Sequence, residues 1–79
     1  MKSYQSVKGY KLTANTPVNI LDTFNAPIIM IQNQGGAAVT VTFNDGEPLQ
    51  MDGIPFAYEP LTPISGVIET DGTDVVVFA

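Results

Sequence analysis

The stretch PIIMIQNQGGAAVTVTFNDGEPLQM, residues 27–51, decides the fold. It contains two runs rich in β-branched and aromatic residues, 27–32 and 38–44. Runs of this composition are typical of β-strands. The residues between them, Asn33-Gln34-Gly35-Gly36, tolerate the positive φ of a tight turn, and Asn44-Asp45-Gly46 repeats that signal before a third run. The stretch therefore predicts consecutive antiparallel strands joined by hairpin turns.

The rest of the chain has the same organisation, because short apolar runs alternate with turn residues and no window has a helical period. We expect an all-β fold, a small antiparallel β-sandwich of jelly-roll or immunoglobulin-like type with seven or eight short strands. Pro48 cannot donate to a ladder and predicts that its strand lies at an edge or bulge. The strands are predicted near residues 6–13, 18–22, 27–32, 38–44, 47–51, 55–59, 66–69 and 74–79.

The 79 residues suffice for one domain. We divide it into an N-terminal arm or leading strand, 1–11, and a sandwich domain, 12–79. All three lysines lie in the first segment and all eight acidic residues lie in the second. Because an acidic body repels phosphate, we expect no nucleic-acid partner. The apolar runs are too short to cross a bilayer and the N-terminus has no signal-peptide pattern, so we expect no membrane partner.

Catalytic and metal-binding signatures are absent from the sequence. The chain has no Cys and no His, which removes the usual activated nucleophiles and zinc ligands. Two acidic groups, Asp45-Gly46-Glu47 and Asp71-Gly72-Thr73-Asp74, are compatible with a calcium site or a carboxylate pair, but we interpret them as solvated turns. We expect a protein that is not an enzyme and has no cofactor.

Two of the predicted strands do not alternate. In 38–44 Val39, Val41 and Phe43 alternate with polar residues, as in a strand with one wet face. In contrast, 27–31 and 75–78 are apolar on successive residues, so both of their faces should be covered. The predicted core is Val18, Ile20, Ile29, Ile31, Val39, Val41, Phe43, Leu49, Ile64, Ile68, Val75 and Val77. The predicted second covered surface is Ile28, Met30, Val76 and Phe78.

Three explanations for the second surface remain open. The first is cover by a neighbouring subunit, in an oligomer. The second is cover by the chain's own N-terminal segment, which contains Tyr4, Val7, Tyr10 and Leu12. The third is that the apolar row tolerates partial exposure. Phe56 and Tyr58 have two interpretations, since they either cap the core or form an exposed aromatic patch for a partner. The candidate interface residues are Tyr4, Lys8, Tyr10, Ile28, Met30, Phe56, Tyr58, Val76 and Phe78.

The order of four sequence segments along the chain suggests a family. LTANTPVNI (12–20) is followed by IIMIQNQG (28–35), AVTVTFNDG (38–46) and SGVIETDGTDVVVF (65–78). In this order the chain resembles small β-sandwich structural proteins of tailed-bacteriophage virions. The resemblance implies a non-enzymatic protein of the virion, a capsid decoration or cement protein or a head or tail accessory.

The implied partners are copies of the chain and another virion protein such as the major capsid protein. The alternative is a receptor- or carbohydrate-binding β-sandwich module that would use Phe56 and Tyr58.

Overall fold

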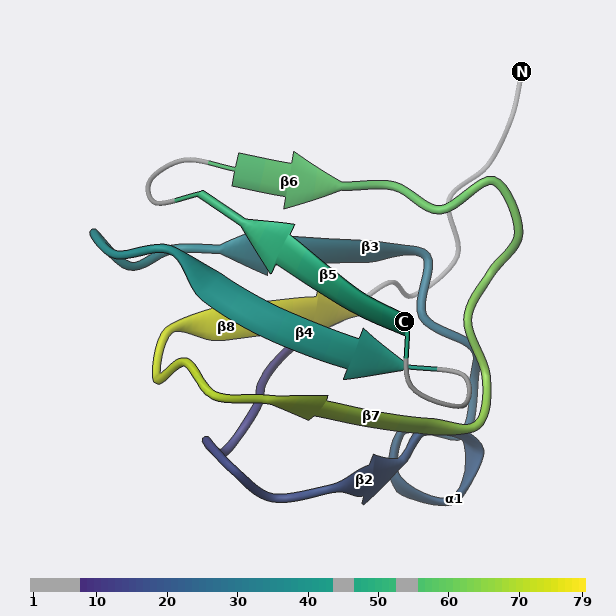
Figure 1. The fold of residues 1–79 in the computed structure, drawn as a ribbon. Helices are drawn as coiled ribbons and strands as arrows, with labels where there is room; N and C mark the ends of the chain where they lie inside the picture. The colour runs from purple at the N-terminus through teal and green to yellow at the C-terminus, as the bar shows by residue number, and fades with distance from the viewer. Residues whose placement is uncertain (1–7, 44–46, 53–55) are drawn as a thin grey trace.

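The computed structural model describes residues 8–43, 47–52 and 56–79, which fold as an all-β, antiparallel sandwich (Figure 1). The predicted fold class is confirmed. The elements are β1 (Gly9–Lys11), β2 (Val18–Asn19), α1 (Ile20–Phe24), β3 (Met30–Asn33), β4 (Val39–Phe43), β5 (Glu47–Met51), β6 (Phe56–Tyr58), β7 (Val67–Thr70) and β8 (Val75–Phe78).

The strand order is that of a jelly roll. Sheet A has the order β1-β8-β3-β6 and sheet B the order β2-β7-β4-β5. Each strand of the first half pairs with its mirror position in the second half, β1 with β8, β2 with β7, β3 with β6 and β4 with β5. The chain is thus a long folded-back ribbon that wraps into two layers, and Figure 1 shows sheet B in front of sheet A.

Only one of the predicted hairpins joins paired strands. Residues 44–46 connect β4 to β5, which are antiparallel neighbours. The predicted hairpin at Asn33–Gly36 is wrong, because β3 lies in sheet A and β4 in sheet B. β3 pairs instead with β8 and β6, its neighbours in space from the other half of the ribbon. The turn signal was correct about the reversal of the chain but not about the partner strand.

The core lies between the sheets. Seven of the twelve predicted core residues are fully buried, and four others, Val18, Val39, Phe43 and Leu49, are partly buried against them. The sequence analysis missed Leu12 and Met51. The buried apolar residues are Leu12, Ile20, Ile28, Ile31, Val41, Met51, Ile64, Ile68, Val75 and Val77.

Ile28 and Ile29 exchange their predicted places. Ile28, predicted on the second surface, is fully buried, whereas Ile29, predicted in the core, is 40% exposed. Ile28 exchanges two 2.8 Å backbone hydrogen bonds with Ile64. The Ile29 N–H donates to the Phe78 carbonyl, although Met30 is the residue paired with Phe78. Ile29 is therefore an extra residue before β3, and it shifts the side-chain alternation by one position.

The predicted strand at 18–22 becomes a two-residue strand followed by helix α1. The Asn19 side chain accepts a hydrogen bond from the Asp22 N–H at 3.1 Å and caps the helix. Asn25 ends it in the left-handed conformation, with φ of 59°. An asparagine at each end is a local sequence signal for a short helix. The apolar residues in 18–21 led instead to the prediction of a strand.

The edges of the sheets agree with the sequence. β5, which contains Pro48, is an edge strand of sheet B, as predicted. Residues 9–11 of the segment predicted as an arm or leading strand form β1, an edge strand of sheet A. No helix among the described residues is long and apolar enough to span a membrane.

Candidate assembly surface

The outer face of sheet A is the surface that faces away from the core, and its centre is apolar. In β8, Val75 and Val77 are fully buried, so the alternating Val76 and Phe78 point outward. In β3, Ile31 is fully buried, and Met30 and Gln32 point outward on either side of it. Three apolar side chains on the two central strands therefore face away from the sandwich.

The registers of the strands arrange these side chains in two rows. One row contains Gly9, Phe78 and Met30, and the next contains Lys11, Val76, Gln32 and Ala57. A Cβ on Gly9 would lie 3.1 Å from Phe78 Cε2 and 3.3 Å from Val76 Cγ1. The Phe78 ring thus leans over the glycine of β1, and the apolar area extends from β3 to the edge of the sheet.

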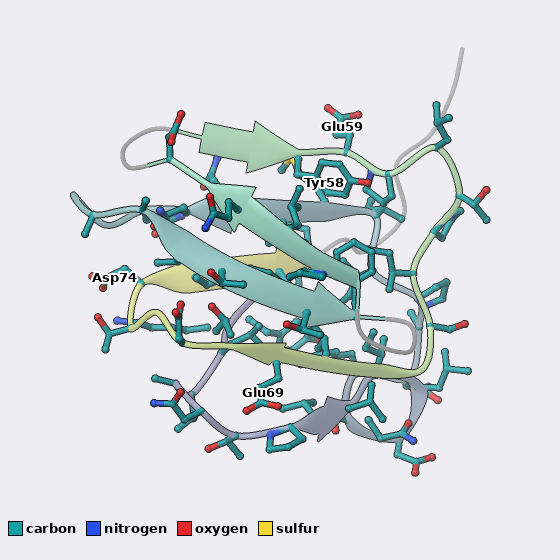
Figure 2. The ribbon with its side chains drawn as sticks, in the orientation of Figure 1. Tyr58, Glu59, Glu69 and Asp74 are labelled. Carbon is teal, nitrogen blue, oxygen red and sulfur yellow. The ribbon has the colours of Figure 1, made fainter. Side chains whose placement is uncertain are left out.

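Charged side chains stand at two opposite corners of this face, Lys11 with its ion-pair partner Asp74 at one corner and Glu59 at the other. Lys11 lies at the β1 end of the second row, on the outer side, because Tyr10 before it packs on the core. Glu59 follows β6 at the other edge and is exposed. Tyr58 packs toward the core, and Figure 2 shows Glu59 and the Tyr58 ring leaving the chain in opposite directions. Since β6 pairs with β3, Glu59 continues the row of Met30 and Phe78.

The outer face of sheet B is mainly polar, and its apolar residues are Val67, which is 49% exposed, and Pro48, which pairs with Thr42. On its central strands Thr42 lies opposite Glu69, and on the edge strand Gln50 lies opposite Thr40. Glu69 is exposed between the buried Ile68 and Thr70 (Figure 2). This face has the composition of an ordinary solvated sheet surface.

One end of the sandwich extends the apolar area. It is the end at which β3 and β7 begin and β8 ends, on the right in Figure 1. The large hydrophobic side chains that are exposed in the described structure, Leu21, Ile29, Leu61 and Val67, all belong to this end. Because Ile29 directly precedes Met30, the apolar outer face of sheet A continues around this end.

The structure separates the candidate interface residues into groups. Met30, Val76 and Phe78 lie together on the outer face of sheet A. Ile28 does not join them, because it is in the core. Lys8 is exposed beside this face, where its backbone exchanges hydrogen bonds with Ala79.

The two candidate tyrosines that the structure describes, Tyr10 and Tyr58, point toward the core. Tyr10 stacks on Phe24 with ring centroids 4.7 Å apart, and Tyr58 contacts Phe43 at 6.2 Å. The first pair joins sheet A to helix α1, and the second joins the two sheets. The interpretation of Tyr58 as a core cap therefore agrees with the structure. Tyr4 and the Phe56 side chain lie outside the described part of the chain.

Sequence reasoning missed Lys11, Gln32, Ala57 and Glu59 as residues of this face. Their positions follow from the register of β1 and β6 against the central strands. The sequence contains no signal for that register, because these strands are brought together from distant parts of the chain.

A polar corner closes the opposite end of the sandwich, and the buried Asn33 is its centre. Its Nδ2 donates to the carbonyls of Ala37 and Asp52 at 2.9 Å each, and its Oδ1 accepts from the Gly35 N–H at 2.9 Å. Asn33 thus joins the β3–β4 connection to the end of β5, where the chain leaves sheet B.

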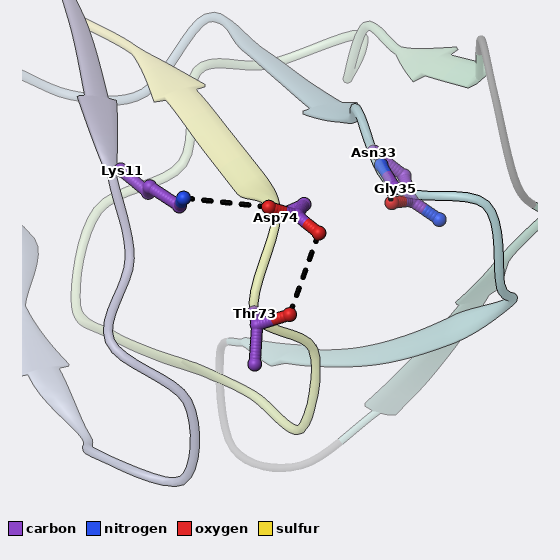
Figure 3. Close-up of polar contacts among 5 residues, drawn as sticks. All are labelled: Lys11, Asn33, Gly35, Thr73 and Asp74. Carbon is purple, nitrogen blue, oxygen red and sulfur yellow. Dashed lines mark hydrogen bonds and ion pairs between the residues drawn. The ribbon is translucent and has the colours of Figure 1, made fainter.

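The turn between β7 and β8 is held in the same corner. The buried Thr70 Oγ1 donates to the Thr40 carbonyl and accepts from the Gly72 N–H, at 3.0 and 3.1 Å. Asp71 Oδ1 accepts from the Thr40 N–H at 2.8 Å. Asp74 forms an ion pair with Lys11 at 3.3 Å and accepts from the Thr73 hydroxyl (Figure 3). The two aspartates therefore already have partners within the chain.

An open cleft of about 310 Å³ lies in this corner, between residues 33–39 and 71–74. Within the described residues, no three Asp, Glu, His or Cys side chains gather as metal ligands would. The Asp71–Asp74 segment is a hydrogen-bonded structural turn, more strongly held than the solvated turn predicted from the sequence.

Comparison with protein-family models, with curated proteins and with solved structures finds no match to this chain.

Proposed function

We propose that this chain is a non-enzymatic structural protein of a phage virion, a capsid decoration or cement protein or a head or tail accessory. It acts by association of the outer face of sheet A with copies of the chain, and the assembly contacts another virion protein such as the major capsid protein. The virion location rests on the resemblance of the sequence phrases.

One observation carries the assembly role: the apolar centre of the outer face of sheet A, formed by Met30, Val76 and Phe78. The outer face of sheet B, in the same small protein, is mainly polar, with Val67 as its exposed aliphatic residue. An exposed apolar sheet face is a common feature of protein–protein interfaces. The jelly roll is used by capsid proteins and by lectins alike, so the face supports the proposal more specifically than the fold does.

No observation favours the carbohydrate-binding alternative. That function needs solvent-facing aromatic rings, and the Tyr58 ring packs against Phe43 and the core.

The test of the assembly role is the molar mass of the purified protein, measured by light scattering on a sizing column. We expect an oligomer that Val76→Lys dissociates, with a Kd at least about 100-fold higher, because a charge would be buried at the centre of the interface. Thr42→Lys is the matched control, since Thr42 is also half-buried on a central strand but faces outward from sheet B. A monomeric wild type, or equal effects of both lysines, contradicts the proposal.

The virion location has its own test, the detection of peptides from this chain by mass spectrometry in purified particles of the phage that carries its gene. Absence from the particles overturns the location and leaves the assembly role to the first test.

A further inference from the structure

The charges at the corners of the outer face of sheet A suggest how two copies of the chain meet. This inference rests on the proposed function, because it concerns the same face. Four exposed or half-buried side chains define the relevant geometry: Lys11 and Glu59 at the corners, and Val76 and Met30 between them.

Lys11 and Glu59 lie on a diagonal of the face. Lys11 is on β1 and Glu59 follows β6, three strand positions away. At about 4.8 Å a strand, this places them about 14 Å apart across the sheet. Lys11 shares its row with Ala57, and Glu59 lies two residues further on, which adds about 7 Å along the strands. The apolar side chains of β8 and β3 occupy the area between the two corners.

A two-fold axis that lies in the interface and is perpendicular to this diagonal exchanges the corners. Two copies packed face to face in this way place Lys11 of each over Glu59 of the other. The same contact covers the apolar centre of both copies, as an isologous interface requires. We propose that the occupant of this face is a second copy of the chain, in a two-fold dimer with two reciprocal Lys11–Glu59 ion pairs at its rim.

The charge distribution favours this pairing. Among the described residues the cations are Lys8 and Lys11, both on or next to β1. If Glu59 faced an acidic surface of the second copy, two like charges would be placed together. In the reciprocal contact, each Glu59 instead faces a lysine. The intrachain ion pair of Lys11 with Asp74 does not prevent it, since both side chains are largely exposed, 63% and 49%. Such a pair contributes little and leaves the ammonium group free to reach a second carboxylate.

The experiment is a charge exchange, with dimer dissociation measured by sedimentation or light scattering at low salt. We expect Lys11→Glu and Glu59→Lys each to raise the Kd about tenfold, because each turns two attractive pairs into repulsive ones. The double variant, Lys11→Glu with Glu59→Lys, restores attraction with the signs exchanged and should return the Kd to within about threefold of the wild type.

Two controls isolate the reciprocal pair. Glu69→Lys changes the net charge as Glu59→Lys does, but on the outer face of sheet B, and should leave the Kd unchanged. Asp74→Asn removes the intrachain partner of Lys11 and should also leave the dimer intact.

The outcomes separate the two proposals. Single variants without effect, a double variant no better than the singles, or a trimeric wild type overturn this geometry while the face can still be the assembly surface. A wild type that is monomeric at millimolar concentration overturns both and leaves the N-terminal segment as the cover of the face. A dimer that responds to the charge exchange and dissociates with Val76→Lys supports both.

Discussion

The two outer faces of this sandwich are built by the same rule but differ in chemistry, since the face of sheet B is mainly polar and the centre of the face of sheet A is apolar. In each sheet, the residues that alternate with buried core residues point outward. In sheet B these include Thr42 and Glu69 together with one apolar residue, Val67, and in sheet A they include Val76 and Phe78. Since the sheets share one core and similar size, the fold does not require apolar residues on either outer face. The apolar residues of sheet A therefore serve another purpose, and association is the purpose we propose.

The comparison also separates stability from assembly. Residues that point inward from either sheet should control unfolding, and residues that point outward from sheet A should control association. Substitutions at inward and outward positions test that separation.

Ile28→Ala and Ile29→Ala shorten two adjacent side chains that lie on opposite sides of the sheet. Ile28→Ala should lower the free energy of unfolding by about 2–5 kcal/mol, because it leaves a cavity in the core. Ile29→Ala should lower it by less than about 1 kcal/mol, since Ile29 is partly exposed already. Denaturant unfolding followed by circular dichroism measures both values. Equal losses would contradict the extra residue before β3.

Asn33→Ala tests the corner that holds the two sheets together. It should cost about 2–3 kcal/mol of unfolding free energy, because the carbonyls of Ala37 and Asp52 lose their common donor. The neighbouring Gln32→Ala, on the outer face of sheet A, is the control and should change stability by less than about 0.5 kcal/mol. A neutral Asn33→Ala would show that the crossing between the sheets does not depend on this side chain.

Thr42→Val combined with Glu69→Val should give sheet B an apolar outer face of its own. The free energy of unfolding should change by less than about 1 kcal/mol, because both positions face outward. The mean mass in light scattering should nevertheless rise above that of the wild type, since each molecule would have two adhesive faces. An unchanged mass would mean that an apolar sheet face alone is not sufficient for association in this fold.

Much of the fold could be predicted from the sequence because its signals are local. The β-branched runs and Gly-containing turns specify strands and reversals, and Pro48 correctly marks an edge. The absence of alternation in 75–78 predicted a strand covered on both faces. Val75 and Val77 are buried as predicted, and the cover of Val76 and Phe78 stays a prediction. The clean alternation of 39–43 correctly indicated the polar outer side of β4.

Other features of the fold depended on contacts between distant segments of the folded chain. The partner of each strand is chosen between segments far apart in the chain, so the turn at Asn33–Gly36 could be recognised but its crossing between sheets could not. The extra residue Ile29 reverses which isoleucine is buried, and only the pairing of its N–H with Phe78 reveals it.

The sequence by itself determined that this protein is a β-sandwich with an apolar surplus in two strands, because composition and alternation act residue by residue. Only the tertiary structure decided where that surplus lies. The pairing of β8 between β1 and β3 gathers Met30, Val76 and Phe78 on one face and places Lys11 and Glu59 at its corners. A shared face is a property of strands aligned in register, and that register is fixed by burial of the common core.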